Sequence, residues 1–195
     1  MSFNKKKYEI VVIGVSAGGM QILPEILSGI KDNFPLPVII VNHIAPSSDN
    51  YFAMLLQEKC KLKVKEADEK ELIENSVIYT SPPNYHLLIE SDKTFCLSVD
   101  QRINYARPSI DVLFYSASDV YKSRIISVVL TGANSDGAKG ARYIKKNGGL
   151  VIVQDPATAY IEVMPQSVID ICEVDFILNP NQIAEKLNKL AEINI

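Results

Sequence analysis

The sequence predicts an α/β fold: a mostly parallel sheet with helices on both faces, in a Rossmann-like three-layer arrangement, and an antiparallel hairpin insertion around residues 76–99. Two observations lead to this class. Apolar, β-branched runs alternate with segments whose apolar residues recur at helical spacing, which favours parallel strands buried on both faces. In the middle of the chain, turn residues separate short β-like runs, which is typical of hairpins. The length of 195 residues fits one domain over 1–195.

The first half of the chain supplies two predicted strand–helix units. Residues 8–13 are apolar except for Glu9 and end at Gly14, which predicts a buried strand. Residues 18–30 carry apolar side chains at helical spacing, and a proline near the start of a helix is tolerated. A second buried strand is expected over 37–41, and a second helix over 49–60.

The middle segment has a different pattern. Its β-like runs cover 76–80, 85–89 and 94–99, and the turn sequences Pro82-Pro83-Asn84 and Ser91-Asp92-Lys93 separate them. Turn residues at this spacing predict hairpins rather than crossover connections. We therefore expect this segment to be an insertion in the main sheet.

The helix–strand alternation returns after Pro108 and continues to the end of the chain. Strands are expected over 124–130, 149–153 and 174–177, and helices over 109–122, 137–147, 164–171 and 181–193.

Composition excludes several classes of function. The net charge of −3 and the lack of a long basic run argue against nucleic-acid binding. No apolar run approaches the ~20 residues that span a bilayer, and the N-terminus has no signal-peptide pattern. The three cysteines, Cys60, Cys96 and Cys172, lack paired metal-ligand spacing. We expect a cytoplasmic protein without a metal site.

The first strand ends in a candidate nucleophile turn. Gly14-Val15-Ser16-Ala17-Gly18 matches the G-x-S-x-G pattern between a strand and a helix, where helix N–H groups can stabilise an oxyanion. The same glycines are also compatible with a phosphate-binding turn or with a tight turn of no catalytic role. The motif alone leaves these alternatives open.

A histidine and an aspartate follow two other predicted strands. His43 ends the second strand and is the better candidate base, because His86 lies in the hairpin region, where a surface or hairpin role is expected. Asp136 begins a helix, so it is either a helix cap or the acid that orients the imidazole. Asp111 and Asp155 are competing carboxylates.

The order of these residues argues against one familiar fold. In ordinary α/β-hydrolases the histidine follows the serine and the acid, whereas here no histidine follows residue 86. The matching pentapeptide therefore does not indicate that fold.

Six separated motifs, in order along the chain, resemble those of the catalytic domain of the chemotaxis protein-glutamate methylesterases, the CheB family. They are IGVSAGG at 13–19, NHIAP at 42–46, ARPSIDVLF at 106–114, LTGANSDGAKG at 130–140, QDPAT at 154–158 and MP at 164–165. The resemblance implies Ser16 as nucleophile, His43 as base and Asp136 as orienting acid. It also implies hydrolysis of γ-glutamyl methyl esters on the cytoplasmic helices of chemoreceptors, possible glutamine deamidation, and no cofactor.

The chain departs from the family pattern at three points. It starts almost at the first strand, so we expect a free-standing relative without a receiver domain. Ala17 and Ala133 stand where many members have threonine and methionine, which bears on substrate and rate. We expect the backbone N–H groups of Ala17 and Ala133 to bind the oxyanion, and Arg107 to bind substrate.

Two other classes of function compete with the esterase. One is a non-catalytic regulatory relative that binds receptors or signalling partners, which the intact serine, histidine and aspartate disfavour. The other is nucleotide binding through the glycine turn. The sequence does not determine the oligomeric state.

Overall fold

The computed structural model describes residues 7–43, 51–103 and 106–192. Within them, seven parallel strands form one sheet in the order β3-β4-β2-β1-β7-β8-β9. The strands are β1 (Ile10–Val15), β2 (Val38–Asn42), β3 (Lys63–Glu66), β4 (Val77–Thr80), β7 (Ile125–Val129), β8 (Leu150–Gln154) and β9 (Phe176–Leu178).

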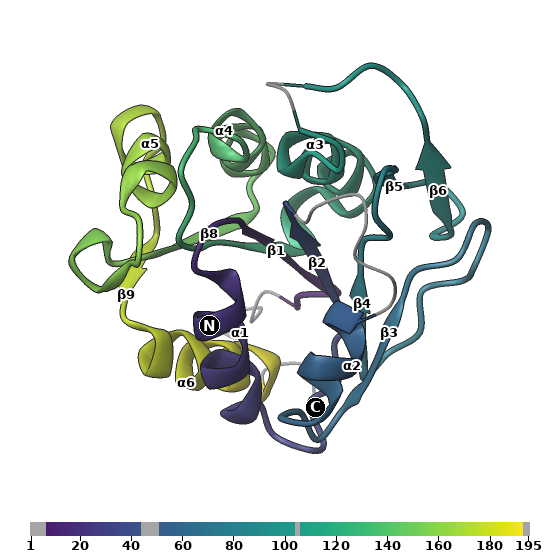
Figure 1. The fold of residues 1–195 in the computed structure, drawn as a ribbon, viewed down its shortest axis with the longest axis horizontal. Coiled ribbons are helices and arrows are strands. Elements are labelled where there is room, and N and C mark those ends of the chain that lie inside the picture. Colours follow the sequence, from purple (N-terminus) through teal and green to yellow (C-terminus); the bar gives the residue numbers. More distant parts are fainter. Residues whose placement is uncertain (1–6, 44–50, 104–105, 193–195) are drawn as a thin grey trace, which may run out of the picture.

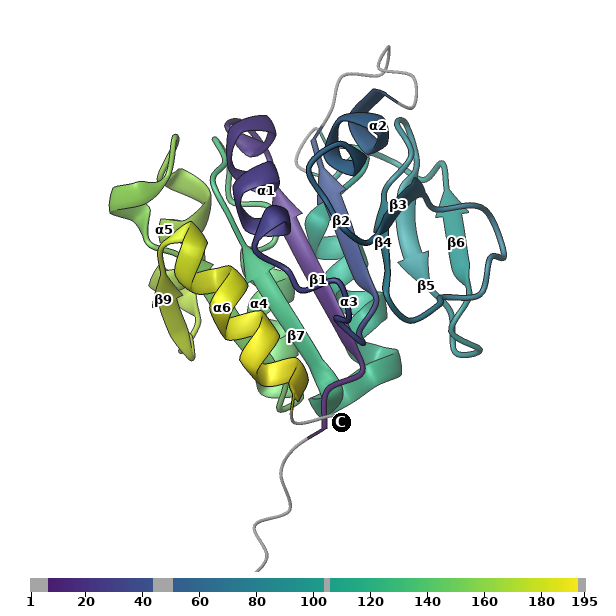
Figure 2. The same ribbon diagram turned by 90° about the horizontal axis from the view of Figure 1, so that it is seen from below.

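Helices cover both faces of this sheet (Figures 1 and 2). One face packs against α1 (Gly19–Ser28), α2 (Tyr51–Gln57) and α6 (Pro180–Ala191). The other packs against α3 (Ile110–Tyr121), α4 (Ala138–Lys146) and α5 (Val163–Ile171). Two short 3-10 helices, Lys122–Arg124 and Pro156–Thr158, complete the connections. The expected three-layer α/β class is confirmed. In the described part of the chain, no helix is both long and apolar enough to span a membrane.

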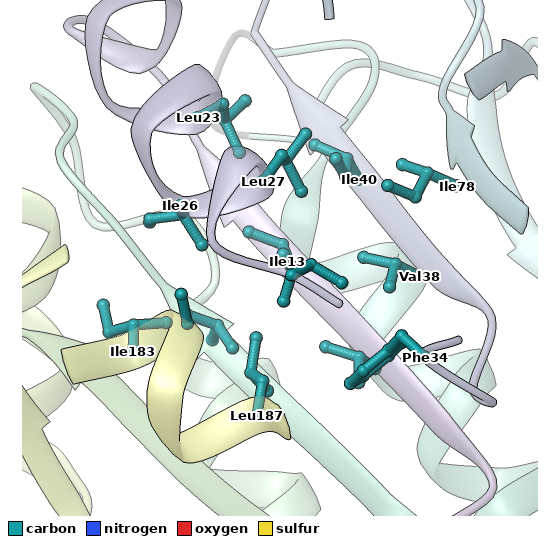
Figure 3. Close-up of a cluster of buried hydrophobic side chains, with 14 of the residues drawn as sticks. Ile13, Leu23, Ile26, Leu27, Phe34, Val38, Ile40, Ile78, Ile183 and Leu187 are labelled. Carbon is teal, nitrogen blue, oxygen red and sulfur yellow. The ribbon is translucent and has the colours of Figure 1, made fainter. Parts of the chain in front are cut away.

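The central strands β1, β2, β7 and β8 are almost continuously apolar because both of their faces are buried. Along β1, Val11 and Ile13 point to the α1 and α6 layer, and Ile10 and Val12 point to the opposite layer. Figure 3 shows the first cluster, in which Ile13 lies under the α1 side chains. The helices are held by this burial on both sides of β1.

Gly14 interrupts the apolar run of β1 for a steric reason. A Cβ at this position would lie 2.4 Å from Cγ2 of Ile110, the first residue of α3. The glycine therefore lets the N-terminus of α3 approach the end of β1. This close approach places α3 beside the turn that contains Ser16.

The hairpin region needs one correction. The antiparallel pairing is confirmed only for β5 (His86–Ile89) and β6 (Phe95–Ser98), which form their own two-stranded sheet. The run expected over 76–80 lies instead in the main sheet as β4, with all four side chains buried between parallel neighbours. This run is short and turn residues follow it, which is why its sequence pattern predicted a hairpin.

The structure also contains a strand that the sequence pattern did not predict. β3, with the sequence KVKE, is the edge strand beside β4, and only Val64 in it is buried. An edge position tolerates the lysines that conceal a strand pattern. The expected helix start at 49–50 and helix end at 193 lie outside the described residues.

The parallel register brings three strand ends to one edge of the sheet. Val15 pairs with Asn42 at the ends of β1 and β2, and Gly14 pairs with Val129 at the end of β7. The segments that follow contain Ser16, His43 and residues 130–136. Ligand sites of open α/β sheets lie at this carboxyl edge.

Candidate active site

The turn after β1 presents Ser16 at the start of α1. The Ser16 N–H donates to the Thr131 carbonyl at 3.0 Å, and its carbonyl accepts the Gly19 N–H at 2.9 Å. Gly18 has φ 89°, a left-handed conformation that glycine adopts without a steric penalty. The bond to Thr131 ties the serine turn to the segment that follows β7, and the bond from Gly19 closes the turn itself.

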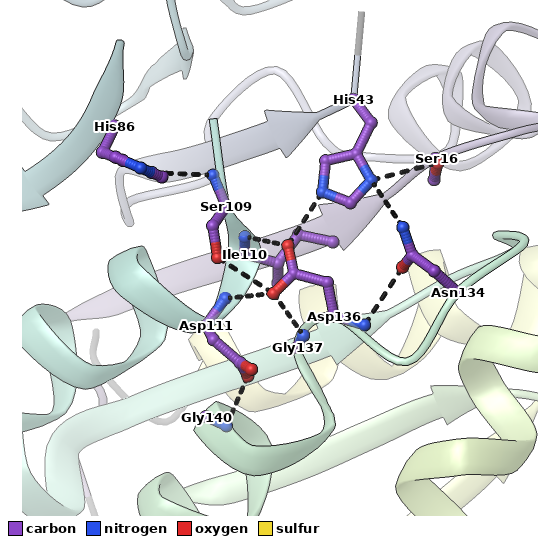
Figure 4. Close-up of polar contacts among 10 residues, drawn as sticks. All are labelled: Ser16, His43, His86, Ser109, Ile110, Asp111, Asn134, Asp136, Gly137 and Gly140. Atoms are coloured by element: carbon purple, nitrogen blue, oxygen red, sulfur yellow. Dashed lines mark hydrogen bonds and ion pairs between the residues drawn. The ribbon is translucent and has the colours of Figure 1, made fainter. Parts of the chain in front are cut away.

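His43 lies between Ser16 and Asp136 (Figure 4). Its Nδ1 is 3.2 Å from the Ser16 Oγ, and its Nε2 is 2.8 Å from the Asp136 Oδ2. The His43 N–H donates to the Val15 carbonyl at 3.3 Å, so backbone as well as side chain is attached to the serine turn. The three residues expected to act together are thus connected by hydrogen bonds.

Asp136 is fully buried and saturated with donors. Its carboxylate lies at the N-terminus of α3, and donors surround both of its oxygens. They are His43 Nε2, Ser109 Oγ and the N–H groups of Ile110, Asp111 and Gly137, at 2.7–3.0 Å. Helix N–H groups with the positive end of the helix dipole favour a negative charge there.

Burial is the largest single influence on this carboxyl and opposes its ionisation. The hydrogen bonds from His43 and from the N–H groups of Asp111 and Ile110 outweigh burial and hold the pKa of Asp136 below its ordinary value. Asp136 is therefore a carboxylate at neutral pH, which suits it to orient an imidazole and to stabilise its charged form.

The tautomer of His43 follows from a neighbour that the sequence analysis did not single out. Asn134 Oδ1 accepts the Asp136 N–H at 3.0 Å, so the amide nitrogen Nδ2 faces His43 Nδ1 at 3.3 Å. An amide nitrogen can only donate, so Nδ1 accepts and the ring proton is on Nε2, which donates to Asp136. Nδ1 is then the atom available to take the proton of Ser16.

A second missed residue supports the carboxylate from the other side. Ser109 donates its hydroxyl to Asp136 Oδ1 at 3.0 Å, and its N–H donates to His86 Nδ1 at 3.2 Å. His86 Nε2 donates to the Gln101 carbonyl at 3.1 Å. Two roles were expected for His86, one in the hairpin and one at the surface. His86 lies in the hairpin, but it is only 1% exposed, so the expected surface role is wrong.

The signals for these supporting residues were present but weak. Ser109 directly precedes a helix, and Asn134 stands two residues before Asp136. The local sequence therefore indicates only turn or cap residues at both positions. Nothing in the local sequence shows that His86 reaches Ser109 from a separate hairpin.

The competing carboxylates have other partners. Asp111 accepts the Gly140 N–H at 2.7 Å, and Asp155 accepts the Ala157 N–H at 3.0 Å at the start of a 3-10 helix. Burial, the largest influence, raises the pKa of Asp111 to about 6, and the negative charge of Asp136 adds to this effect. Asp136 is the carboxylate bonded to His43.

Backbone donors near Ser16 include those expected at an oxyanion site. Within the described segments, the N–H groups of Ala17 and Ala133 donate to no other group of the chain. A Cβ on Gly132 would lie 3.0 Å from the Ser16 Cβ, so the segment before Ala133 runs close to the serine. Binding of an oxyanion there stays a prediction.

Arg107 is held by backbone groups next to the hairpin. Its Nη1 donates to the carbonyls of Val99 and Asp100 at 2.6 and 3.0 Å, while its buried Nε has no partner in the described residues. These bonds fix the segment that leads into α3. A role in substrate binding also stays a prediction. Over the same residues, no three histidine, cysteine or acidic side chains gather as metal ligands do.

Comparisons with known proteins agree on one family. A family model described as CheB methylesterase matches residues 11–187. A relative from Leptospira interrogans is 51% identical over 188 residues, which cover 96% of this chain and 97% of the relative. A Thermotoga maritima protein named protein-glutamate methylesterase/protein-glutamine glutaminase is 38% identical over 93% of this chain, and the match spans 54% of that protein. The crystal structure of the Thermotoga maritima CheB methylesterase catalytic domain superposes with a TM-score of 0.90, at 38% identity, over 94% of this chain and 99% of that domain.

Proposed function

Since the chain belongs to the CheB methylesterase family, we propose that it hydrolyses γ-glutamyl methyl esters on the cytoplasmic helices of methylated chemoreceptors, giving glutamate and methanol. The observation that carries the mechanism is the connected row of Ser16, His43 and Asp136. Such a substrate implies action in the cytoplasm. The same site would also deamidate receptor glutamines, the second activity in the names of the relatives.

The first step forms an acyl-enzyme. The Ser16 Oγ attacks the ester carbonyl carbon while His43 Nδ1 takes the hydroxyl proton. The imidazolium that results is stabilised by the buried Asp136 carboxylate through the Nε2–H bond. When the tetrahedral intermediate collapses, the bond to the methoxy oxygen breaks and His43 returns the proton to it, so methanol leaves.

The second step restores the enzyme. Water attacks the acyl carbon and gives a proton to His43 Nδ1, and the Ser16 Oγ leaves with that proton. The product is a glutamate carboxylate on the receptor. In the deamidation route the first leaving group is ammonia instead of methanol, and the second step is unchanged.

We assign two supporting roles in this reaction. The N–H groups of Ala17 and Ala133, which have no acceptor among the residues described, would donate to the oxyanion that develops on the carbonyl oxygen. Arg107 would bind an acidic group of the substrate through the part of its guanidinium that does not contact the backbone.

Methanol release from a methylated receptor fragment tests the proposal. Ser16→Ala should lower kcat by about 10³-fold or more, because the nucleophile is lost. Ser28→Ala, which removes an exposed serine of α1, should retain activity. A serine-directed acylating probe should label the native chain at Ser16. Full methanol release by Ser16→Ala would exclude the assignment.

A further inference from the structure

One face of α4 carries three cations for which the described residues provide no ion pair. Lys139, Arg142 and Lys146 are exposed and spaced i, i+3 and i+7, so they lie in a row along the helix. Within the described residues none of them forms an ion pair or a hydrogen bond. Lys145 on the same helix differs, because it pairs with Asp175 at 2.6 Å. The row is therefore available for a partner.

Apolar and aromatic side chains line the same hollow as this row. Tyr115 of α3, Tyr143 of α4 and Ile171 of α5 surround a groove of about 300 Å³ together with the three cations. The two tyrosine rings meet edge to face, with centroids 5.1 Å apart. Tyr115 and Ile171 are 38% and 42% exposed, which is high for such side chains. The lining of the groove is thus partly apolar and aromatic and partly basic.

One end of the groove, at Lys139, lies near the edge of the sheet that holds the candidate active site. Helix α4 begins at Ala138, two residues after Asp136, and α3 begins where Asp136 accepts its N–H groups. Lys139 lies at this end of α4, and Lys146 lies about 10 Å further along the axis. The three helices α3, α4 and α5 lie side by side on this face (Figure 1).

We propose that this groove, lined by Tyr115, Lys139, Arg142, Tyr143, Lys146 and Ile171, binds an acidic segment of the substrate next to the ester being cleaved. The inference rests on the proposed function. Each ester that is hydrolysed leaves a glutamate carboxylate, so a segment with several sites becomes acidic beside its remaining esters. Its carboxylates match the three cations of the groove, and the aliphatic parts of its side chains match Tyr115, Tyr143 and Ile171.

The charge of the whole chain makes this location selective. The net charge is −3, so an acidic segment is repelled by the protein as a whole and attracted at a basic patch. Exposed cations at the rim of an interface act mainly on the association rate, and their effect is screened by salt. The groove would therefore affect substrate capture, not the chemistry at Ser16.

Peptide binding and turnover together test this proposal. Two helical peptides carry one γ-methyl glutamate each, flanked by glutamates in one and by glutamines in the other. The groove variant is Lys139→Gln/Arg142→Gln/Lys146→Gln. The control variant is Lys59→Gln/Lys61→Gln/Lys63→Gln, which changes three exposed lysines toward the amino edge of β3. Both variants change the net charge by the same amount. At low salt the groove variant should raise KM and Kd for the acidic peptide about tenfold, with kcat unchanged and no effect on the glutamine peptide. The difference should disappear in 0.5 M salt.

Binding of fluorescently labelled peptide to Ser16→Ala protein separates this proposal from the proposed function, because it needs no turnover. Weaker binding of the acidic peptide by the groove variant alone supports the groove, even where no methanol is released by the native chain. Equal losses in groove and control variants, or equal losses for both peptides, would overturn it. So would an unchanged Kd for the acidic peptide.

Discussion

The Asp136 carboxylate accepts the Ile110 N–H at 2.7 Å, a contact as short as its 2.8 Å bond with His43. The same oxygen, Oδ2, takes both bonds, while Oδ1 accepts from three other donors. One side chain therefore holds the N-terminus of α3 and orients the imidazole. Any change at Asp136 should affect stability and activity together.

Asp136→Asn should lower kcat by about 10³–10⁴-fold. The amide oxygen should stay at the Oδ1 position, where three donors converge, which puts the amide NH₂ against His43 Nε2. Nε2 must then accept, so the ring proton moves to Nδ1 and the base for Ser16 is lost. We also expect the free energy of unfolding to fall by about 1–2 kcal/mol, since α3 loses a charged cap.

Methanol release and urea denaturation measure these two effects. Asp155→Asn is the matched control, because Asp155 also caps a helical turn through the Ala157 N–H but lies outside the hydrogen-bond network of His43. It should retain kcat. A fully active Asp136→Asn enzyme would contradict the role assigned to this carboxylate.

Asp111 should make stability depend on pH in the opposite sense to Asp136. Its pKa is raised from 3.8 to about 6 in the folded chain, chiefly by burial. The folded state therefore binds this proton more tightly than the unfolded state. The contribution of this proton to the free energy of unfolding is complete below about pH 4 and is lost as the pH rises through about 6.

Asp111→Asn removes the titrating group and keeps an oxygen for the Gly140 N–H. Relative to the native chain, it should raise the free energy of unfolding by about 1–3 kcal/mol at pH 7.5. The gain should shrink toward zero at pH 4, where the native carboxyl is already protonated. Denaturant titrations at the two pH values give the comparison, and a gain that does not change with pH would count against this explanation.

Strand–helix alternation predicted the fold class because burial on both faces of a parallel sheet leaves long apolar runs. Ser16, His43 and Asp136 could be selected because each follows such a run, and the carboxyl ends of parallel strands meet at one edge. β3 and the parallel pairing of β4 could not be predicted from these patterns. An edge strand with two lysines lacks the apolar signal, and the neighbour of a strand is decided by tertiary packing.

The residues that support the site could not be predicted from local sequence patterns, for a different reason. Ser109 and Asn134 have side chains that normally bond to nearby backbone, so their sequence context indicates caps and turns. Their bonds to Asp136 and His43 join segments 27 and 91 residues apart along the chain. The fold must be known before such contacts can be identified.

Gly132→Ala should impair catalysis more than folding. The added Cβ would lie 2.6 Å from Met164 Cε, which can move, and 3.0 Å from the Ser16 Cβ, which carries the proposed nucleophile. We expect kcat to fall about 10²-fold, since small displacements of reacting groups are costly. Gly29→Ala is the control, because its Cβ would lie 2.8 Å from the Ala184 Cβ between α1 and α6. It should lower Tm and leave kcat near the native value; the reverse ranking would refute the argument.

Asn134 provides the sharpest test of the tautomer of His43. Asn134→Ala removes one donor to Nδ1 while Asp136 still accepts from Nε2, so kcat should fall at most about tenfold. Asn134→Asp keeps an oxygen for the Asp136 N–H but turns a carboxylate toward Nδ1. That carboxylate favours a proton on Nδ1, which can then no longer take the proton of Ser16. We therefore expect a loss of about 10²-fold or more.

Nitrogen-15 NMR of the two histidine rings distinguishes a change in the protonation of His43 Nδ1 from a general structural effect of the substitution. The native chain and Asn134→Ala should show His43 with an unprotonated Nδ1 and a protonated Nε2, whereas Asn134→Asp should lose the unprotonated Nδ1 signal. The signals of His86, which donates from Nε2 to the Gln101 carbonyl, should stay constant and serve as an internal control. Native ring signals together with native kcat in Asn134→Asp would mean that Asn134 does not control the proton on which the proposed mechanism depends.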